Sequence, residues 1–269
     1  MAYLRPVRLE EAIALMARTP CVPLAGGTDF YPARTTAGPD ETVLDLAGIA
    51  ALRGVAVRPD GVRIGALATW TELLAAPLPP LFDGLKQAAA RVGGRQVQNA
   101  GTLGGNLCNA SPAADGIACL LALDATVELA GPAGTQRLKV AEFVLGNRRT
   151  ARAPDEILAA IEVPLPPAPA RSVFLKLGAR AYLVISIVMV AATALYDGSG
   201  RVRDLRLAVG AAGPRALRLP AAERAALAGE VLGPGHLAVL SPIDDMRASA
   251  SYRTEAALVL LRRALAALR

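Results

Sequence analysis

The chain has 269 residues, 53% of them apolar and 19% charged, so it is long and apolar enough to bury the core of one large or two ordinary domains. This composition excludes a disordered chain, and the 25 glycines and 20 prolines follow no period that would indicate a collagen-like repeat. The formal net charge is +6, but the basic residues are scattered and only 4% of the residues are aromatic, which argues against a nucleic-acid groove.

Apolar runs, cysteines and histidine set further limits on the class of protein. The longest apolar run, 181–196, is shorter than the about 20 residues that a membrane-spanning helix needs, and no apolar signal-peptide segment follows the first residues, so no membrane span is predicted. The three cysteines form no C-x-x-C pair, which favours a reducing cytoplasm and excludes an iron–sulfur cluster held by this chain alone. A single histidine, His236, disfavours histidine-based metal sites, and no metal ligand is assigned.

Helical and strand patterns alternate along the first part of the chain. The expected helices cover 9–18, 71–76, 81–92 and 112 to about 124, and the expected strands cover 22–25, 42–46, 62–67, 125–130, 135–140 and 157–163. The helix from 112 is expected to begin with Pro112 at its first position and Ser111 as its N-cap. The stretch 93–111 before it is rich in glycine and asparagine and is expected to be a loop.

A proline-rich segment divides the chain. Val163–Arg171 contains four prolines, which neither a helix interior nor a central strand accepts, so this segment is interpreted as a linker between two domains. Beyond it, the patterns of 173–177, 185–196 and 203–210 predict a three-stranded antiparallel sheet, and 221–228 and 254–268 predict helices. We therefore expect an α+β protein with one domain over 1–165 and a smaller domain over 171–269.

Two glycine-rich segments form the candidate site. The first, Leu24–Asp29, directly follows a predicted strand, and the second is Asn99–Leu107. Glycines allow positive φ and let an anion approach successive backbone amides without a Cβ in the way. Thr28, Thr102 and Asn106 add side-chain donors, so the pair of segments suits a pyrophosphate held from two sides. Neither segment matches G-x-G-x-x-G or a P-loop, and the alternative interpretation is that the glycines only make tight turns.

Asp115 lies shortly after the second segment, in the expected first turn of the next helix. Its carboxylate would either compensate the helix dipole or accept hydrogen bonds from a ribose or ribityl hydroxyl. The spacing leaves both roles open.

The segment Asn99–Asp115 resembles the second flavin loop of the FAD-binding, or medium, subunits of the molybdenum hydroxylases, a family that includes carbon monoxide dehydrogenase and bacterial xanthine dehydrogenase. Ala25–Asp29 is similar to the first flavin loop of that family. Further matching segments follow in order at 43–46, 64–66, 146–150, 154–158, 176–180, 245–249 and 251–253. The resemblance implies an N-terminal FAD-binding domain of the PCMH type, made of two α/β subdomains at about 1–55 and 56–165, followed by a C-terminal domain with the three-stranded sheet.

The resemblance also implies a binding site for non-covalent FAD. Ala25–Asp29 and Thr102–Asn106 would hold the pyrophosphate, Asp115 would contact the ribose or ribityl region, Leu158 would pack near the isoalloxazine ring, and Lys176 would approach the flavin edge. The whole implied cofactor-binding set is Leu24, Ala25, Gly26, Gly27, Thr28, Asp29, Gly101, Thr102, Gly104, Gly105, Asn106, Asn109, Ser111, Asp115, Leu158 and Lys176. No catalytic residue is assigned to this chain.

Other interpretations of single residues stay open in the sequence. Lys176 could instead be a solvated strand lysine, and Cys108, the one thiol within a flavin segment, is interpreted as a small packed residue. Ala179-Arg180 and Asn147 depart from the arginine pair and the tyrosine of many relatives, which puts the substrate-side neighbourhood in doubt.

The function that the resemblance implies is electron transfer. A partner subunit with [2Fe-2S] clusters, itself supplied by a large molybdopterin subunit that hydroxylates the substrate, would reduce the FAD, which would pass electrons to NAD, oxygen or a quinone. The expected assembly is a heterotrimer or a dimer of heterotrimers. The alternatives are a non-redox module that binds a nucleotide or another phosphorylated ligand, and a structural subunit whose flavin site has decayed.

Overall fold

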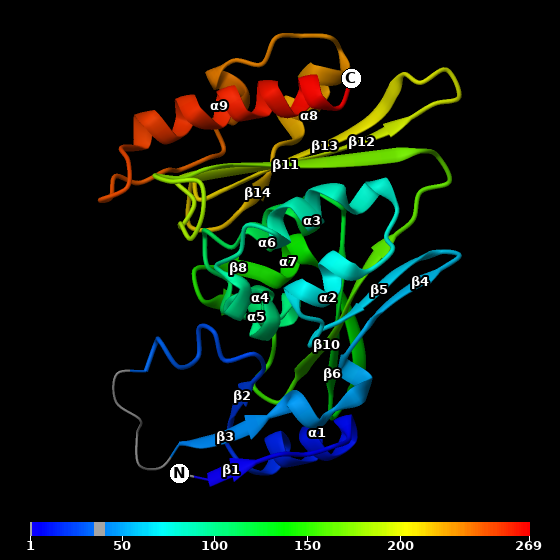
Figure 1. The fold of residues 1–269 in the computed structure, drawn as a ribbon, viewed down its shortest axis with the longest axis vertical. Helices are drawn as coiled ribbons and strands as arrows, with labels where there is room; N and C mark the ends of the chain where they lie inside the picture. Colours follow the sequence, from blue (N-terminus) through cyan, green and yellow to red (C-terminus); the bar gives the residue numbers. More distant parts are fainter. Residues whose placement is uncertain (1, 35–40) are drawn as a thin grey trace.

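The computed structural model describes residues 2–34 and 41–269. Within these residues the strands form three main sheets that follow one another along the long axis of the molecule, together with one small sheet of two short strands (Figure 1). The N-terminal sheet lies at one end of this axis and the C-terminal helices lie at the other. The expected α+β class is confirmed.

The N-terminal layer is a parallel sheet in the order β1-β3-β2, formed by Ala2–Leu4, Thr42–Asp45 and Val22–Leu24. Helix α1 (Leu9–Arg18) connects β1 to β2, and the helical spacing of its apolar residues buries Ala12 and Met16 in the same cluster as Leu44. Two 3₁₀ turns, η1 (Leu46–Gly48) and η2 (Ala50–Leu52), lead to the next layer. Strand β2 ends at Leu24, the first residue of the first glycine-rich segment.

The middle layer is an antiparallel sheet covered by short helices. Its strands, in the order β4-β5-β10-β6-β7, are Val55–Arg58, Gly61–Gly65, Ile157–Pro164, Thr126–Gly131 and Gly134–Lys139. The helices are α2 (Trp70–Ala75), η3 (Pro80–Phe82), α3 (Asp83–Ala89), α4 (Arg95–Ala100), α5 (Leu103–Asn109), α6 (Asp115–Ala122) and α7 (Val140–Phe143). The small sheet pairs β8 (Val144–Gly146) with β9 (Arg149–Thr150).

The C-terminal layer is an antiparallel sheet in the order β11-β12-β13-β14, formed by Ala170–Leu177, Val188–Tyr196, Val202–Gly210 and Leu217–Arg218. The three expected strands are confirmed, and the short strand β14 adds a fourth at one edge. Helices α8 (Pro220–Leu227) and α9 (Ala250–Ala267) cover one face, with η4 (Pro234–Leu237) between them in sequence. The other face packs on α3 and α6 of the middle layer.

Strand β12 is buried on both faces. Val188, Val190 and Ala192 belong to the cluster beneath α8 and α9, whereas Met189 and Ala191 belong to the core of the middle layer. This alternation follows from the period of two in a strand. The C-terminal sheet therefore shares its core with the layer that carries α6.

Three expectations about local structure are wrong. The stretch 93–111 is not a continuous loop, because α4 and α5 form within it. Helix α6 begins at Asp115 rather than at Pro112, since a turn from the Ala114 amide to the Ser111 carbonyl comes first. The linker is also shorter than expected, because β10 extends to Pro164 and β11 begins at Ala170. No helix of the described residues is long and apolar enough to cross a membrane.

Buried polar contacts fix the C-terminal sheet on the middle layer. The Ser172 hydroxyl on β11 donates to the Leu81 carbonyl at 2.6 Å and accepts from the Gly84 amide at 2.8 Å. The Phe174 amide donates to Gln87 Oε1 at 2.8 Å. A Cβ at Gly84 would lie only 3.0 Å from the Ser172 hydroxyl, so the glycine permits this close approach. These bonds fix the strand that carries Lys176.

We predict that Ser172→Ala lowers the free energy of unfolding by about 2 kcal/mol, because it leaves a buried amide and a buried carbonyl without partners. Chemical denaturation followed by far-ultraviolet circular dichroism measures this change. The control is Ser199→Ala in an exposed turn, which we expect to unfold at nearly the wild-type denaturant concentration. Equal effects of the two variants would contradict the prediction.

Candidate functional site

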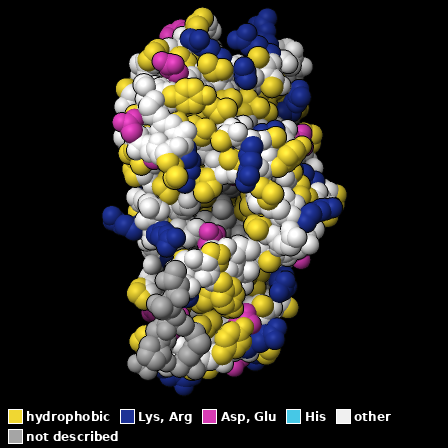
Figure 2. Space-filling view, turned by 60° about the vertical axis from the view of Figure 1, so that its left-hand side comes forward, with side chains coloured by type: hydrophobic (Ala, Val, Ile, Leu, Met, Phe, Trp, Pro, Cys, Tyr) yellow, Lys and Arg dark blue, Asp and Glu magenta, His cyan; other side chains and the backbone are white. Residues whose placement is uncertain are grey.

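A cleft of about 600 Å³ lies between the first glycine-rich segment, helices α4 to α6 and the end of β11. Figure 2 shows the hollow about halfway along the molecule. Its volume is in the range of small-molecule and cofactor sites. Of the predicted site residues, the cleft is lined by Ala25, Gly26, Gly27, Thr28, Asp29, Gly101, Thr102, Gly104, Gly105, Asn106, Asn109, Ser111, Asp115, Leu158 and Lys176. Leu24 is buried in the core behind them.

The first segment requires glycine at two positions. A Cβ on Gly26 would lie 1.8 Å from the Ala100 carbonyl oxygen, so this residue packs directly against the end of α4. Gly27 has a φ of +73°, in the left-handed region that favours glycine. The amides of residues 26–29 donate to no group within 2–34 or 41–269. These residues line the cleft, and successive amides without a partner among the described residues suit an anion site.

The second segment differs from the first, because its amides already have partners. The Leu103 amide donates to the Ala68 carbonyl and the Gly104 amide to the Ala66 carbonyl. The Gly105 amide donates to the Thr102 hydroxyl at 3.0 Å, which makes Thr102 the N-cap of α5. The expectation that both segments offer open backbone amides is therefore wrong for the second one. Gly104 is needed for packing, since its Cβ would lie 2.5 Å from the Ala66 oxygen.

Asn106 is the polar side chain of the second segment that lacks a partner. Its Oδ1 is buried and makes no hydrogen bond to any described residue. A buried polar atom without a partner costs about 1–3 kcal/mol, so such atoms call for a water or a ligand. Because Asn106 lines the cleft, its amide group is available to a molecule bound there.

Asp115 and Lys176 form a buried ion pair at the cleft. Lys176 Nζ lies 2.6 Å from Asp115 Oδ2, and the two side chains are 7% and 4% exposed. The Ser186 hydroxyl donates to Asp115 Oδ1 at 2.7 Å. Burial raises the pKa of Asp115, and the Lys176 ammonium opposes this shift. Lys176 is therefore not a solvated strand lysine. Asp115 lies in the first turn of α6 as expected, although the helix starts later than expected, and its carboxylate pairs with Lys176 on β11.

The cleft also contains residues that the sequence analysis did not single out. The Arg34 guanidinium lies 3.5 Å from the centroid of the Phe30 ring and pairs with Glu41 at 2.8 Å. Trp70 is buried and lines the cleft, and its amide donates to the Gly101 carbonyl. The four-residue spacing of Phe30 and Arg34 is a helical signal in the sequence, but only the fold shows that the pair faces a cleft.

Cys108 directly follows the second segment and lines the cleft. Burial raises the pKa of Cys108 to about 11, so the group is a neutral thiol at neutral pH. This fits the interpretation of Cys108 as a packed residue.

Comparisons with known proteins agree with this geometry. The family model for the FAD binding domain in molybdopterin dehydrogenase matches residues 1–166, and that for the CO dehydrogenase flavoprotein C-terminal domain matches residues 174–268. The nicotinate dehydrogenase FAD-subunit of Eubacterium barkeri is 35% identical over 194 residues, which cover 69% of this chain and 66% of that protein. The putative xanthine dehydrogenase FAD-binding subunit of Escherichia coli K12 is 32% identical over 264 residues, which cover 94% of this chain and 90% of that protein.

The solved structures show the same likeness over the whole chain. Carbon monoxide dehydrogenase from Hydrogenophaga pseudoflava matches with a TM-score of 0.89 and 30% identity, over 100% of this chain and 96% of that one. The chain therefore belongs to the family of FAD-binding, or medium, subunits of the molybdenum hydroxylases.

Proposed function

We propose that this chain is the flavoprotein electron-transfer subunit of a molybdenum-containing hydroxylase and that it binds FAD non-covalently in the cleft. The open amides of residues 26–29, held against the end of α4 by the close approach of Gly26, carry this proposal. A row of open amides at a cofactor-sized cleft suits the negatively charged pyrophosphate of FAD. The Cys108 thiol, which lines the cleft and is neutral at neutral pH because its pKa is raised, supports binding without a covalent bond.

The remaining lining residues fit the other parts of FAD. Thr28 and Thr102 would add hydroxyl donors beside the pyrophosphate, and Asn106 would offer its unpaired amide oxygen to a hydroxyl or N–H group. Asp115 would contact the ribose or ribityl region beside its ion pair with Lys176. Leu158, Asn109 and Ser111 complete the proposed binding set, with Leu158 as an apolar wall near the ring. Leu24 would act from behind, by fixing the start of the first segment.

FAD, when bound, supplies the redox chemistry, and the protein supplies binding and electrostatics. Lys176 holds a positive charge in a site that excludes most water. Such a charge stabilises negative charge that develops on a nearby ring more strongly than the same charge in water would. Asp115 and Ser186 keep the ammonium in place, so its position does not have to reorganise during electron transfer.

The partners in this proposal are an iron–sulfur subunit, which donates electrons, and a molybdopterin subunit, which oxidises the organic substrate. The match to carbon monoxide dehydrogenase medium chains over nearly the full length of this chain supports partners of this kind. A heterotrimer, or a dimer of heterotrimers, is the proposed assembly, and the three free cysteines suit a cytoplasmic location. The proposal also includes the domain limits. The FAD-binding domain covers 1–165, with two subdomains divided at about residue 55, and the C-terminal domain covers 171–269.

We predict that the full-length chain binds FAD and that Gly26→Ala weakens this binding by about tenfold to a hundredfold. The added methyl group has to push the first segment away from the Ala100 carbonyl, a displacement that costs about 1–3 kcal/mol. Titration of the apoprotein with FAD, followed by flavin fluorescence and visible absorbance, measures the affinity.

The matched control for this prediction is Gly146→Ala, since a Cβ there meets no atom within 4 Å. We expect it to bind FAD as the wild type does. A wild-type protein that stays colourless, yet binds ADP or pyrophosphate at the same cleft, would instead support the non-redox nucleotide-binding module. Release of FAD in a one-to-one ratio on denaturation would exclude a decayed site.

We predict that Lys176→Met lowers the free energy of unfolding by about 3 kcal/mol, because it leaves the Asp115 carboxylate buried without a countercharge. The pKa of Asp115 in the folded state then rises further above its unfolded value, so the folded state retains a proton that the unfolded state has lost. Stability consequently falls as the pH rises through this window, and the loss is larger at about pH 8 than at about pH 5. Denaturation curves over this pH range measure the effect.

The double variant Lys176→Met/Asp115→Asn serves as the control for this ion pair. It removes the buried charge while it keeps an acceptor for the Ser186 hydroxyl, so most of the lost stability should return. A pH-independent deficit in Lys176→Met would contradict this prediction, because it would show that the substitution does not change the protonation of Asp115 in the folded protein over this pH range.

A further inference from the structure

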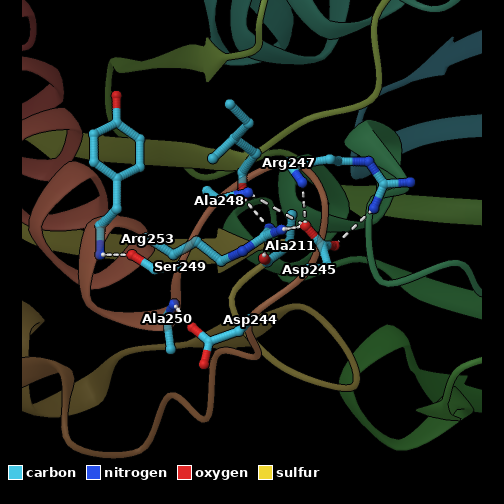
Figure 3. A network of polar contacts seen from close by, with 10 residues as sticks. Ala211, Asp244, Asp245, Arg247, Ala248, Ser249, Ala250 and Arg253 are labelled. Atoms are coloured by element: carbon cyan, nitrogen blue, oxygen red, sulfur yellow. Dashed lines mark hydrogen bonds and ion pairs between the residues drawn. The ribbon is translucent and has the colours of Figure 1, made fainter.

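Arg253, in the first turns of helix α9, is a buried cation that lies outside the cleft. Its side chain is 4% exposed, and it does not line the cleft. One guanidinium nitrogen donates to the Ile187 carbonyl at 2.5 Å and to the Ala211 carbonyl at 2.9 Å, and the other pairs with Asp245 at 2.6 Å. Figure 3 shows Arg253 between Ala211 and Asp245. This one side chain therefore joins α9 to the start of β12 and to the end of β13.

The first of these contacts leads to the cleft through the β11–β12 connection. The Ile187 amide donates to the Leu177 carbonyl at 2.8 Å, which closes the base of the connection next to Lys176. Ser186 precedes Ile187 and donates its hydroxyl to Asp115. The connection itself contributes Val184 and Ile185 to the cleft wall. By holding the Ile187 carbonyl, Arg253 fixes the place from which Ser186 reaches Asp115.

The second contact, to Ala211, is connected by a hydrogen bond to the turn that precedes Asp115. Ala211 follows β13 with a φ of +60°, an unfavourable conformation for a residue with a side chain, and Arg253 holds its carbonyl. The Ala211 amide donates to the Pro112 carbonyl at 2.9 Å. Pro112 lies in the turn that leads into α6, whose first residue is Asp115. The first branch thus reaches the Asp115 carboxylate through Ser186, and the second reaches the turn at Pro112 that precedes Asp115.

Asp245 sets the position of the guanidinium at the surface. The Arg247 amide donates to Asp245 Oδ1 at 2.7 Å, and the Arg247 side chain pairs with Oδ2 at 2.8 Å. The Arg247 amide, with the Arg253 guanidinium, lowers the pKa of Asp245, so the carboxylate stays charged at neutral pH. The Arg253 guanidinium is therefore bound by the Asp245 carboxylate on one side and by the Ile187 and Ala211 carbonyls on the other.

We propose that Arg253 is a positioning residue for the cofactor cleft, which sets the geometry of the Asp115–Lys176 pair from the opposite side of the C-terminal sheet. This inference rests on the proposed function, since it concerns the way in which FAD is held. A purely structural role would stabilise the C-terminal layer without any specific effect on the cleft. The two roles differ in what a substitution does to bound FAD.

Helix α9 provides a matched control for a purely structural arginine. Arg262 also donates to a backbone carbonyl, that of Leu232, with Nε at 3.1 Å, but this contact lies in the other half of the helix. Neither Arg262 nor Leu232 lines the cleft. Arg253→Met and Arg262→Met therefore both remove a guanidinium group from α9. Only Arg253→Met removes the contacts to the Ile187 and Ala211 carbonyls.

The test compares the full-length wild type with four variants, Arg253→Met, Arg253→Lys, Ser186→Ala and Arg262→Met. Four properties are measured for each protein: the affinity for FAD, the visible circular dichroism of bound FAD, its reduction potential, and the Tm. We expect Arg253→Met to weaken FAD binding by about tenfold and to shift both the spectrum and the potential. Arg253→Lys should rescue neither, because an ammonium cannot span two carbonyls and a carboxylate as a planar guanidinium does. Ser186→Ala should shift the same properties in the same direction without touching α9.

Arg262→Met should lower the Tm and leave the affinity, the spectrum and the potential at their wild-type values. The inference is overturned if Arg253→Lys and Ser186→Ala retain these wild-type flavin properties, or if Arg262→Met changes them as much as Arg253→Met does. If Arg253→Met fails to fold, Arg253→Lys supplies the comparison, since it keeps a cation beside Asp245, and Ser186→Ala shows what loss of the Asp115 contact does to bound FAD. If the wild-type chain binds no FAD, the proposed function itself is refuted. If the wild type binds FAD and the Arg253 and Ser186 variants bind it equally well with unchanged flavin properties, only this inference is refuted.

Discussion

The ion pair between Asp115 and Lys176 joins the middle and C-terminal layers inside the cleft. Moving two charges out of water costs several kcal/mol per ion, and only a short contact with further hydrogen bonds offsets that cost. Here the two groups are 2.6 Å apart, and the Ser186 hydroxyl satisfies the second carboxylate oxygen. The packing of β12 and β13 on α6 and of β11 on α3 brings the three groups together. The electrostatics of the cleft therefore depend on how closely these two layers are packed.

The other end of the cleft depends on close backbone contact. Gly26 lies against the Ala100 carbonyl, and Gly104 lies against Ala66. Each segment therefore packs so closely on its neighbour that a Cβ at this glycine would clash. The consequences for the amides differ between the two. Residues 26–29 lie outside the helices and strands, and their amides have no partner among residues 2–34 and 41–269. The amides at the start of α5, in contrast, donate to the Thr102 hydroxyl and to the carbonyls of Ala66 and Ala68. We infer that a bound anion takes most of its backbone hydrogen bonds from the first segment.

Sequence patterns predicted those parts of the fold that local chemistry determines. The alternation of apolar residues predicted β11, β12 and β13, and the glycine-rich segments predicted which residues line the cleft, because glycine at close approaches is a property of the local backbone. The helices α4 and α5 were missed, since Gly93–Ser111 contains several poor helix formers and the segment is helical through contacts with the rest of the layer. The start of α6 was placed too early for a similar reason. Ser111 and Pro112 carry a strong N-terminal signal, but they form a turn whose position is set by Ala211.

Contacts between distant segments could not be predicted from spacing. Lys176 and Asp115 are 61 residues apart, and Arg253 lies 66 residues from Ile187, so no local pattern relates them. The resemblance to a family assigned Asp115 and Lys176 separately to the cofactor, and it did not indicate that the two bind each other. Arg253 was seen in the sequence only as part of a Tyr-Arg match, with no role.

A cleft built from three layers links binding to stability. Its walls come from the N-terminal segment after β2, from the helices of the middle layer and from the connection between β11 and β12. A ligand that binds only the folded chain stabilises it by an amount that grows with the logarithm of the ratio of ligand concentration to Kd. Because the walls of this cleft come from three layers, a bound ligand favours the state in which those layers are packed together. If the proposed function and the proposed role of Arg253 hold, a bound cofactor and helix α9 would act on the same residue, Asp115, from opposite sides of the C-terminal sheet. The affinity of the cleft would then depend on how the layers are joined, and residues that never touch the cofactor would contribute to it.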